Sequence, residues 1–310
     1  MAIAADLYGE NRNFLWGLCY RMTGSTADAE EVVQETFVRV LEKPPRNTKE
    51  PLRPWLVRVA MNLSRDLLRR RRKTEYVGPW LPAPVTQECL EDTAIKEPEA
   101  RPADSPATRY DLIESVSVAF MLAMEALTPA QRAVLLLRDV FDYSTAETAK
   151  ATGITEANVK VTLHRARRVM NDYDKERIRG DATRQAKTQK ALEKFLRCLT
   201  ARDAGGLEQL LTEDVVVISD GGGEVTALLK PMQGREKVMR LVTQLYEQQQ
   251  AITKTSFCVL NGQPSVLVER SEVRPGHASR FTMQCELDHT GRICRINYVF
   301  APSKLTALKV

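Results

Sequence analysis

The sequence predicts a multidomain protein in which two all-α domains are followed by an α+β domain. Three observations lead to this prediction. Residues 128–170 have the spacing of three short helices in helix-turn-helix order. Apolar residues recur at helical spacing through residues 1–75. From about residue 186 the pattern changes to helices followed by β-branched segments and glycine-containing turns.

Composition limits the classes of function. The 310 residues are enough for two or three domains, each with its own core. The formal charge is only +5, from 45 Lys and Arg against 40 Asp and Glu, so any nucleic-acid surface must be local. Six cysteines form no C-x-x-C pair and three histidines are scattered, which predicts no disulfide framework, no metal site and no cofactor. Because the chain has no signal-like N-terminus and no apolar run of about 18 residues, we expect a soluble cytoplasmic protein without membrane contact.

Residues 6–22 and 29–41 are expected to form the first two helices. The apolar stripe of the second consists of Val33, Phe37, Val40 and Leu41. Its polar positions are mostly acidic: Asp28, Glu30, Glu31, Gln34 and Glu35. Such a face is unsuited to DNA, so it is either solvated surface or a binding surface for a protein.

A third helix is expected from Trp55 to Arg72, after a stiff proline-containing loop between Lys43 and Pro54. Its apolar side is predicted to consist of Leu56, Val59, Ala60, Leu63 and Leu67. The other side ends in the basic run Arg70–Lys73, which exceeds what the helix dipole requires. A basic helix beside a rigid loop suits the binding of phosphate and of unstacked bases. Trp55 is either a core residue or a contact.

Residues 76–106 are predicted to form a proline-rich, acidic linker. A passive tether is one interpretation, and a segment that occupies a basic channel in a partner enzyme is the other. The stretch Trp80-Leu81-Pro82-x-Pro84 is unusually apolar for a tether, however, and is expected to dock on another part of the protein. Ser105 and Pro106 are expected to begin a helix that leads into the helix-turn-helix.

Local signals predict the helix boundaries within residues 128–170. Thr128–Pro129 suits the start of the first helix, and Ser144 with Glu147 forms a capping box at the start of the second. Gly153 suits the left-handed residue that ends the second helix, and Thr155 the cap of the third.

The third helix of this segment is amphipathic and basic. Its buried stripe is predicted to be Val159, Leu163, Ala166 and Met170. Outside the stripe lie Asn158, Lys160, Val161, His164, Arg165, Arg167 and Arg168. In a helix-turn-helix this helix enters the major groove of DNA, where cations neutralise phosphates. The alternative is an ordinary helical hairpin with a solvated basic face.

After a charged extension expected at 172–187, the chain turns to α+β structure. The expected order is a helix bearing Leu192 to Leu199, a short helix, a strand at 215–218, a loop at 220–223, a helix at 234–246 and two hairpins. Candidates for an acid–base pair are Asp214, Asp220, Tyr246 and His277. No spacing ties any two of them together, so a regulatory domain is preferred to an enzyme.

The helix-turn-helix segment resembles the −35-reading region of bacterial sigma factors of the extracytoplasmic-function (ECF) group. The matching residues are Leu127-Thr128-Pro129, Gln131-Arg132, Glu147 and the stretch Asn158 to Arg167. The stretch Asp28–Phe37 resembles the sigma segment that docks on the coiled coil of the RNA polymerase β′ subunit. The pattern Trp55-Leu56…Ala60-x-Asn62…Asp66…Arg69-Arg70 resembles the −10-element region of the same family.

This resemblance implies three sets of site residues. The −35 element would be bound by Asn158, Lys160, Val161, His164, Arg165, Arg167 and Arg168. The −10 element would be bound by Trp55, Asn62, Arg65, Arg69 and Arg70, together with the Lys43–Pro54 loop. Core polymerase would be bound by Asp28, Glu30, Glu31, Gln34, Glu35 and Phe37.

Residues 186–305 resemble, more weakly, the SnoaL-like, ketosteroid-isomerase-like cone in the order of their elements. A subgroup of ECF sigma factors joins the same parts, with a W-L-P-x-P linker motif, a D-G-G-G-K loop and an N-P-D-K-L-type tail. Here the loop ends in Glu224, which reverses a charge, and the tail is Ala301-Pro302-Ser303-Lys304-Leu305. Regulatory contacts are expected at Trp80, Leu81, Pro82, Asp220, Gly221, Gly222 and Gly223.

The resemblance implies four segments: sigma region 2 at 1–75, the linker at 76–106, sigma region 4 at 107–175 and a SnoaL-like regulatory domain at 186–305. It implies a sigma factor that is not an enzyme and binds promoter DNA and the β′ and β subunits of core RNA polymerase. The cone would act in cis, through intramolecular contact with the linker or the sigma domains. The alternatives are a one-component helix-turn-helix regulator with a ligand-sensing cone, and an isomerase or hydrolase carried on a DNA-binding protein.

Overall fold

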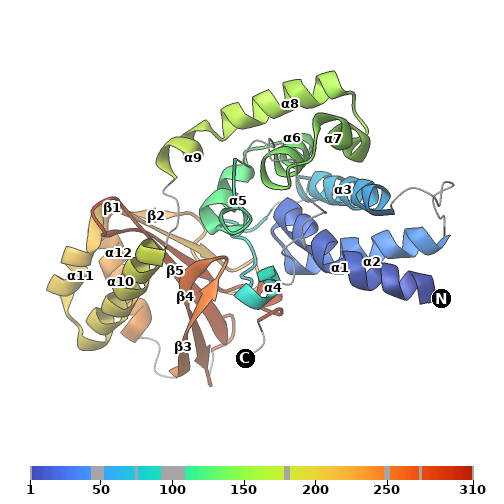
Figure 1. Ribbon diagram of the computed structural model, residues 1–310. Coiled ribbons are helices and arrows are strands. Elements are labelled where there is room, and N and C mark those ends of the chain that lie inside the picture. Colours follow the sequence, from blue (N-terminus) through green and yellow to red (C-terminus); the bar gives the residue numbers. More distant parts are fainter. Residues whose placement is uncertain are drawn as a thin grey trace. The chain divides into compact units, whose positions relative to one another are not determined.

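The computed structural model describes residues 2–42, 52–73, 76–91, 109–177, 182–247, 252–271 and 274–308. The chain forms two compact units (Figure 1). The helical unit comprises Met1–Glu75 and Gln87–Ile178, and the sheet unit comprises Tyr76–Thr86 and Arg179–Val310. The first eleven residues of the predicted linker, 76 to 86, therefore belong with the C-terminal part of the chain.

The helical unit is built from nine described α-helices. Their bounds are α1 (Ala2–Thr23), α2 (Thr26–Glu42), α3 (Leu52–Arg71), α4 (Gln87–Glu91), α5 (Val118–Met124), α6 (Pro129–Leu135), α7 (Thr145–Thr152), α8 (Glu156–Val169) and α9 (Asn171–Glu176). A 3-10 turn, Glu114–Val116, precedes α5, and α6 continues as a π-helical turn, Leu136–Val140. No helix in the described part of the chain is long and apolar enough to cross a membrane.

The predicted helix-turn-helix boundaries are confirmed. Ser144 accepts a hydrogen bond from the Glu147 amide while the Glu147 side chain returns one to the Ser144 backbone. Gly153 ends α7 in the left-handed conformation, with φ 72°, and Thr155 caps α8 through the Asn158 amide.

Two expectations for α3 are corrected. The helix starts at Leu52, so Pro54 lies in its first turn and not in the preceding loop; positions 43–51 of that loop lie outside the described residues. Its buried residues are Leu56, Val57, Ala60, Met61, Ser64 and Leu68, whereas Val59, Leu63 and Leu67 are only partly buried. The buried face is shifted because α3 packs against α1 and α2 and also against α6 and α7.

Three further boundaries differ from expectation. Ser105 and Pro106 lie outside the described residues, and the helix expected there begins only at Val118, where Ser117 is the N-cap. The expected extension at 172–187 is largely helical, because α9 covers its start and a long helix already begins at Ala182. In α2, the predicted Val33 and Phe37 are buried, but Val40 is only partly buried and Leu41 is 68% exposed, and Val32 joins the buried stripe.

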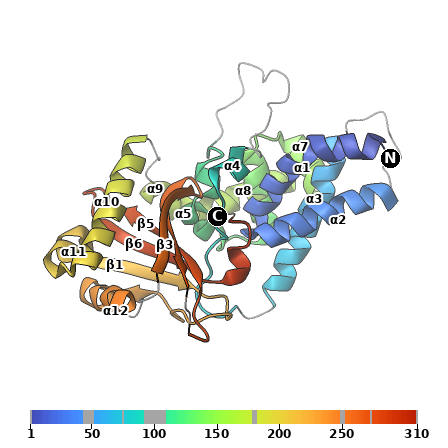
Figure 2. The same cartoon turned by 90° about the horizontal axis from the view of Figure 1, so that it is seen from below.

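The sheet unit places three helices against one six-stranded sheet (Figures 1 and 2). Its elements are α10 (Ala182–Ala201), α11 (Ala204–Leu210), β1 (Leu211–Asp220), β2 (Met232–Gln233), α12 (Arg235–Glu247), β3 (Ile252–Leu260), β4 (Gln263–Arg270), β5 (Arg280–Leu287) and β6 (Ile293–Val299). The strand order is β2-β1-β6-β5-β4-β3, with β1 and β6 parallel and the other pairs antiparallel. This is the predicted α+β architecture, and only the short strand β2 was not expected.

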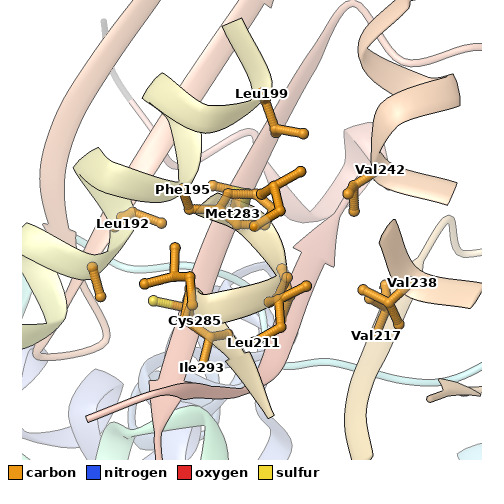
Figure 3. Packing of buried hydrophobic residues seen from close by; sticks show 14 of the residues in the cluster. Leu192, Phe195, Leu199, Leu211, Val217, Val238, Val242, Met283, Cys285 and Ile293 are labelled. Atoms are coloured by element: carbon orange, nitrogen blue, oxygen red, sulfur yellow. The ribbon is translucent and has the colours of Figure 1, made fainter. Parts of the chain in front are cut away.

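The core of the sheet unit lies between the helices and one face of the sheet. Leu192, Phe195 and Leu199 project from α10 towards Met283 and Cys285 of β5 (Figure 3). Val238 and Val242 of α12 face Val217 of β1 (Figure 3). Buried polar side chains of the same unit include Asp220, Gln284 and Asn297.

Candidate nucleic-acid interface

The exposed face of α8 is basic. Val159, Leu163 and Ala166 are buried, which holds α8 on α6 and α7. The opposite side is exposed and consists of Asn158, Lys160, Val161, His164, Arg165 and Arg168. Val161 is 50% exposed in the middle of these polar side chains, as expected of an apolar contact to a base edge. The structure thus brings together six of the seven residues predicted for the −35 element.

Arg167 differs from the other six. It donates two hydrogen bonds to the Asp139 carboxylate, from Nε at 2.9 Å and from Nη2 at 2.6 Å. Asp139 is only 2% exposed, at the π-helical turn that follows α6. Hydrogen bonding to Asp139 raises the pKa of Arg167. The guanidinium therefore fastens α8 to the rest of the helix-turn-helix, although the Arg167 side chain remains 42% exposed, and its contact with phosphate stays a prediction.

The predicted −10 residues on α3 are partly covered by α7. Arg65 donates a hydrogen bond of 2.8 Å to the carbonyl of Thr152, the last residue of α7. Burial lowers the pKa of Arg65, and the neighbouring Arg69 lowers it further. Asn62 and Trp55 are half-buried. Arg69 and Arg70 are exposed, and Arg69 pairs with Asp66 at 3.0 Å.

Two buried arginines join the two halves of the helical unit. Arg132 of α6, 2% exposed, donates to the carbonyl of Met22 near the end of α1 and to the carbonyl of Met124. Arg21 of α1, also 2% exposed, donates to Ser115 Oγ and to the Leu112 carbonyl. Burial lowers the pKa of Arg21 to about 10. These contacts are not predictable from the sequence, because nothing local distinguishes an arginine that will be buried against a distant helix end.

The predicted polymerase-binding face of α2 is mixed. Glu31 and Gln34 are exposed, whereas Asp28, Glu30 and Glu35 are partly buried. Glu30 pairs with Arg12 at 2.9 Å and Glu35 with Arg39 at 2.9 Å. These ion pairs neutralise part of the negative charge of α2.

Phe37 does not belong to this exposed face. It is 8% exposed and packs on Tyr8 with ring centroids 4.8 Å apart, so its expected role as a direct contact is corrected to a core role. The exposed apolar side chains of α2 are Val38, 45% exposed, and Leu41, 68% exposed. With Glu31 and Gln34 they form a strip at spacings of three, four and three residues, which we call the α2 strip.

Residues 76–86 dock on the sheet unit at Asp220, the last residue of β1. The Asp220 carboxylate is fully buried and accepts hydrogen bonds from Tyr76 Oη at 2.6 Å and from the Leu81 amide at 2.7 Å. Lys304 Nζ lies 2.5 Å from the same carboxylate and also donates to the Leu81 carbonyl. Lys304 Nζ lies 4.9 Å from the ring centroids of both Tyr76 and Trp80.

The docking continues along the segment. Leu81, Pro82, Ala83, Pro84 and Val85 are all buried. At the far end Val85 exchanges hydrogen bonds with Asn261, at the β3–β4 turn.

In the glycine loop after Asp220, Gly222 and Gly223 both have positive φ. A Cβ on Gly223 would lie 3.2 Å from Val77, so this loop needs glycine for close approach. The structure brings the predicted linker and loop residues together, with Lys304 as an additional member.

The reversed charge at Glu224 has a matching change in the tail. The Glu224 carboxylate accepts hydrogen bonds from the backbone amide of Ser303, at 3.3 Å, and from the Ser303 hydroxyl. The subgroup pattern has lysine and aspartate at these two positions. In this chain the loop therefore carries the negative charge of the polar contact with the tail.

The candidate catalytic residues do not form a site. Asp214 and His277 are exposed, Tyr246 is partly exposed, and Asp220 is occupied by the linker segment and Lys304. Among the described residues, no group of three or more His, Cys, Asp and Glu side chains is placed to hold a metal ion.

Comparison with known proteins gives matches to both helical halves and to the whole arrangement. Residues 7–74 match the Sigma-70 region 2 family and residues 117–170 match Sigma-70, region 4. The chain is 30% identical over 238 residues to the ECF RNA polymerase sigma factor SigJ of Mycobacterium tuberculosis, covering 76% of this chain and 71% of that protein. It is 36% identical over 214 residues to SigG of the same species, covering 66% of this chain and 58% of SigG.

The fold is similar to the crystal structure of Mycobacterium tuberculosis extracytoplasmic function sigma factor SigJ. The TM-score is 0.72 at 23% identity, and the similarity covers 98% of both chains.

Proposed function

The chain belongs to the ECF RNA polymerase sigma factors, and from this membership we propose how its parts divide the work of directing core polymerase to promoters. The exposed face of α8 binds the −35 element, and α3 takes part in opening the −10 element. The observation that carries this assignment is the face of six exposed residues on α8, held by a buried apolar stripe and by the Arg167–Asp139 pair. Because core RNA polymerase and promoter DNA are cytoplasmic in bacteria, the protein is proposed to act in the cytoplasm.

The α2 strip is the surface that we assign to core polymerase. Its two exposed apolar side chains, Val38 and Leu41, provide apolar area that a partner can bury. Glu31 and Gln34 provide polar groups that can orient the partner through hydrogen bonds. Exposed apolar side chains of this size are otherwise unfavourable on a helix surface. Direct contacts of Glu30 and Glu35 are less favoured, because both already pair with arginines of the same unit.

The helical unit must open for both promoter elements to be bound at once. Elements centred at −35 and −10 are about 25 base pairs apart, or about 85 Å at 3.4 Å per pair. A compact unit of about 170 residues has a radius of gyration of about 15 Å and a diameter of about 40 Å. The buried contacts of Arg21, Arg65 and Arg132 therefore belong to a closed form, in which α7 covers part of the −10 side of α3.

The sheet unit is proposed to act in cis and to do no catalysis. Of its four candidate acid–base groups, Asp214 and His277 are exposed, Tyr246 is partly exposed, and Asp220 is bonded to the Leu81 amide and to Lys304. It holds residues 76–86 through Asp220, Lys304 and Asn261. Because this segment lies between the −10 and −35 parts of the helical unit in the sequence, holding it limits how far the two parts can separate.

The decisive experiment is co-elution of the full chain with core RNA polymerase in size exclusion. Wild type is expected to co-elute, and Glu31→Lys with Leu41→Asp is expected to abolish co-elution. Asp214→Lys, an exposed charge reversal in the sheet unit, is the control and should co-elute. If wild type fails to co-elute but footprints duplex DNA alone, the one-component regulator replaces the sigma assignment.

A further inference from the structure

Helix α10 carries a basic stripe that the sigma assignment does not explain. Its buried side, which includes Leu192, Phe195 and Leu199, packs in the core of the sheet unit. On the other side four cations are exposed at spacings of three, four and three residues: Lys187, Lys190, Lys194 and Arg197. We call these four residues the α10 stripe. At 1.5 Å per residue they span about 15 Å of the helix.

The four cations of the α10 stripe share one carboxylate on their own helix, which stands at i+3 from Lys190 and four residues before Arg197. The single acidic residue of α10 is Glu193, which is partly buried and accepts a hydrogen bond from Gln189 at 2.9 Å. None of the four cations forms an ion pair with a described carboxylate, whereas Arg235 of α12 pairs with Glu208, and Arg295 of β6 with Glu286.

The arrangement is unfavourable for the helix itself. Each neighbouring pair in the α10 stripe stands at i,i+3 or i,i+4, where like charges destabilise a helix. A solvated face would normally mix both signs of charge. The α10 stripe is therefore suited to a polyanion and not to helix stability.

Covalent geometry keeps the α10 stripe near the DNA that α8 binds. Helix α8 ends at Val169 and α10 begins at Ala182. The chain from residue 170 to residue 182 has twelve steps, which reach at most about 40 Å at about 3.4 Å per step. That length corresponds to about 12 base pairs of duplex. When α8 occupies the major groove, the tether keeps the local concentration of duplex phosphates around α10 high.

We propose that the α10 stripe binds the phosphate backbone of duplex DNA beside the α8 site, so that the sheet unit adds a sequence-independent contact to promoter binding. The inference rests on the proposed function for its biological setting. The charge pattern on which it depends is a property of the sheet unit alone. Side chains spaced along one face of a helix can meet successive phosphates, and such contacts position a protein without reading its sequence.

The test measures binding of the full chain to a fluorescein-labelled, random-sequence 30-base-pair duplex between 50 and 200 mM salt. Wild type is compared with Lys190→Gln/Lys194→Gln. Removing two phosphate contacts should lower the slope of log K against log salt by about 1.8. Over this fourfold range of salt, wild type should then lose about tenfold more affinity than the variant. The melting temperature of the variant should not fall, because the substitution removes like-charge neighbours.

The matched control is Lys237→Gln/Arg240→Gln, which removes the same charge from exposed positions on α12. Its salt slope should equal that of wild type. An equal loss in both variants would mean a general net-charge effect and would overturn the α10 assignment, as would no loss in either. The same variants can be tested on vesicles of anionic phosphatidylglycerol. If the α10 stripe affects binding to these vesicles but not to DNA, the DNA assignment is overturned as well.

Polymerase co-elution of the same proteins separates this inference from the proposed function. A chain that binds polymerase but shows no stripe effect on DNA retains the sigma assignment and loses the α10 inference. A chain that shows the stripe effect but never binds polymerase loses the sigma assignment and retains the α10 inference.

Discussion

Replacing Asp220 with alanine should release residues 76–86 from the sheet unit. The carboxylate is fully buried, and its partners are Tyr76 Oη, the Leu81 amide, the Gly222 amide and Lys304 Nζ. The side chain of Lys304 is only 11% exposed, so the substitution leaves a nearly buried ammonium without its counter-charge. Breaking a buried pair by removing one partner costs about 3–5 kcal/mol. Because Lys304 keeps its bond to the Leu81 carbonyl, we expect the lower end of this range.

The assay is amide hydrogen exchange, followed by mass spectrometry of peptides from residues 76–86 in the full chain. A loss of about 3 kcal/mol should make opening of this segment more than about a hundredfold more frequent, since each 1.4 kcal/mol is a factor of ten. The Leu81 amide reports most directly, because it donates to the Asp220 carboxylate itself. Peptides from α8 should keep their wild-type exchange.

Asp214→Ala on the same strand is the control, because this carboxylate is exposed and its loss should not change exchange in residues 76–86. The double variant Asp220→Ala/Lys304→Met should recover part of the protection, since it leaves no unpaired buried charge. Exchange of residues 76–86 within twofold of wild type in Asp220→Ala would refute the role of Asp220 as the anchor of the segment.

Three further predictions concern single interactions. Asp139→Ala should lower the free energy of unfolding by about 2 kcal/mol in urea titration, because Arg167 loses two charge-assisted hydrogen bonds; an unchanged midpoint would contradict the pairing. Glu224→Lys alone should lower the melting temperature, because the hydrogen bonds to Ser303 are lost. Adding Ser303→Asp should restore it, since the new lysine then has a carboxylate partner. An additive loss would show that the two positions are independent. Burial raises the pKa of Cys285 to about 12, so at pH 8 only about one thiol in ten thousand is ionised. Iodoacetamide should therefore modify Cys285 only after unfolding in urea, and mass spectrometry can check this.

Local features of the fold were predictable because their causes are local. The caps at Ser144 and Thr155 and the left-handed end at Gly153 follow from side-chain hydrogen bonding and backbone sterics within a few residues. The β3–β4 turn at Asn261-Gly262 is similar, with φ values of 52° and 70°.

Contacts between distant segments were less predictable. The apolar residues of α3 permit more than one buried face, and packing on both sides of the helix selects the face that contains Val57 and Met61. Arg167 borders the buried stripe of α8, four residues after Leu163, but only the structure shows that its partner is the buried Asp139. The apolar residues at 80–84 indicated docking and the tail motif included Lys304, but only the structure showed that Lys304 bonds to the Leu81 carbonyl and to Asp220.

The sequence by itself determined the order of the domains, the helix-turn-helix and its basic face, the α+β character of the C-terminal part and the membership of a sigma family. These properties depend on periodicity, caps and motifs, which lie within short stretches of the chain. Only the tertiary structure decided which arginines are buried against helix ends, which face of α3 is covered and where residues 76–86 are bound. Those outcomes depend on charges and surfaces that meet across long stretches of sequence, where the free energy of burial is set by partners that no local pattern identifies.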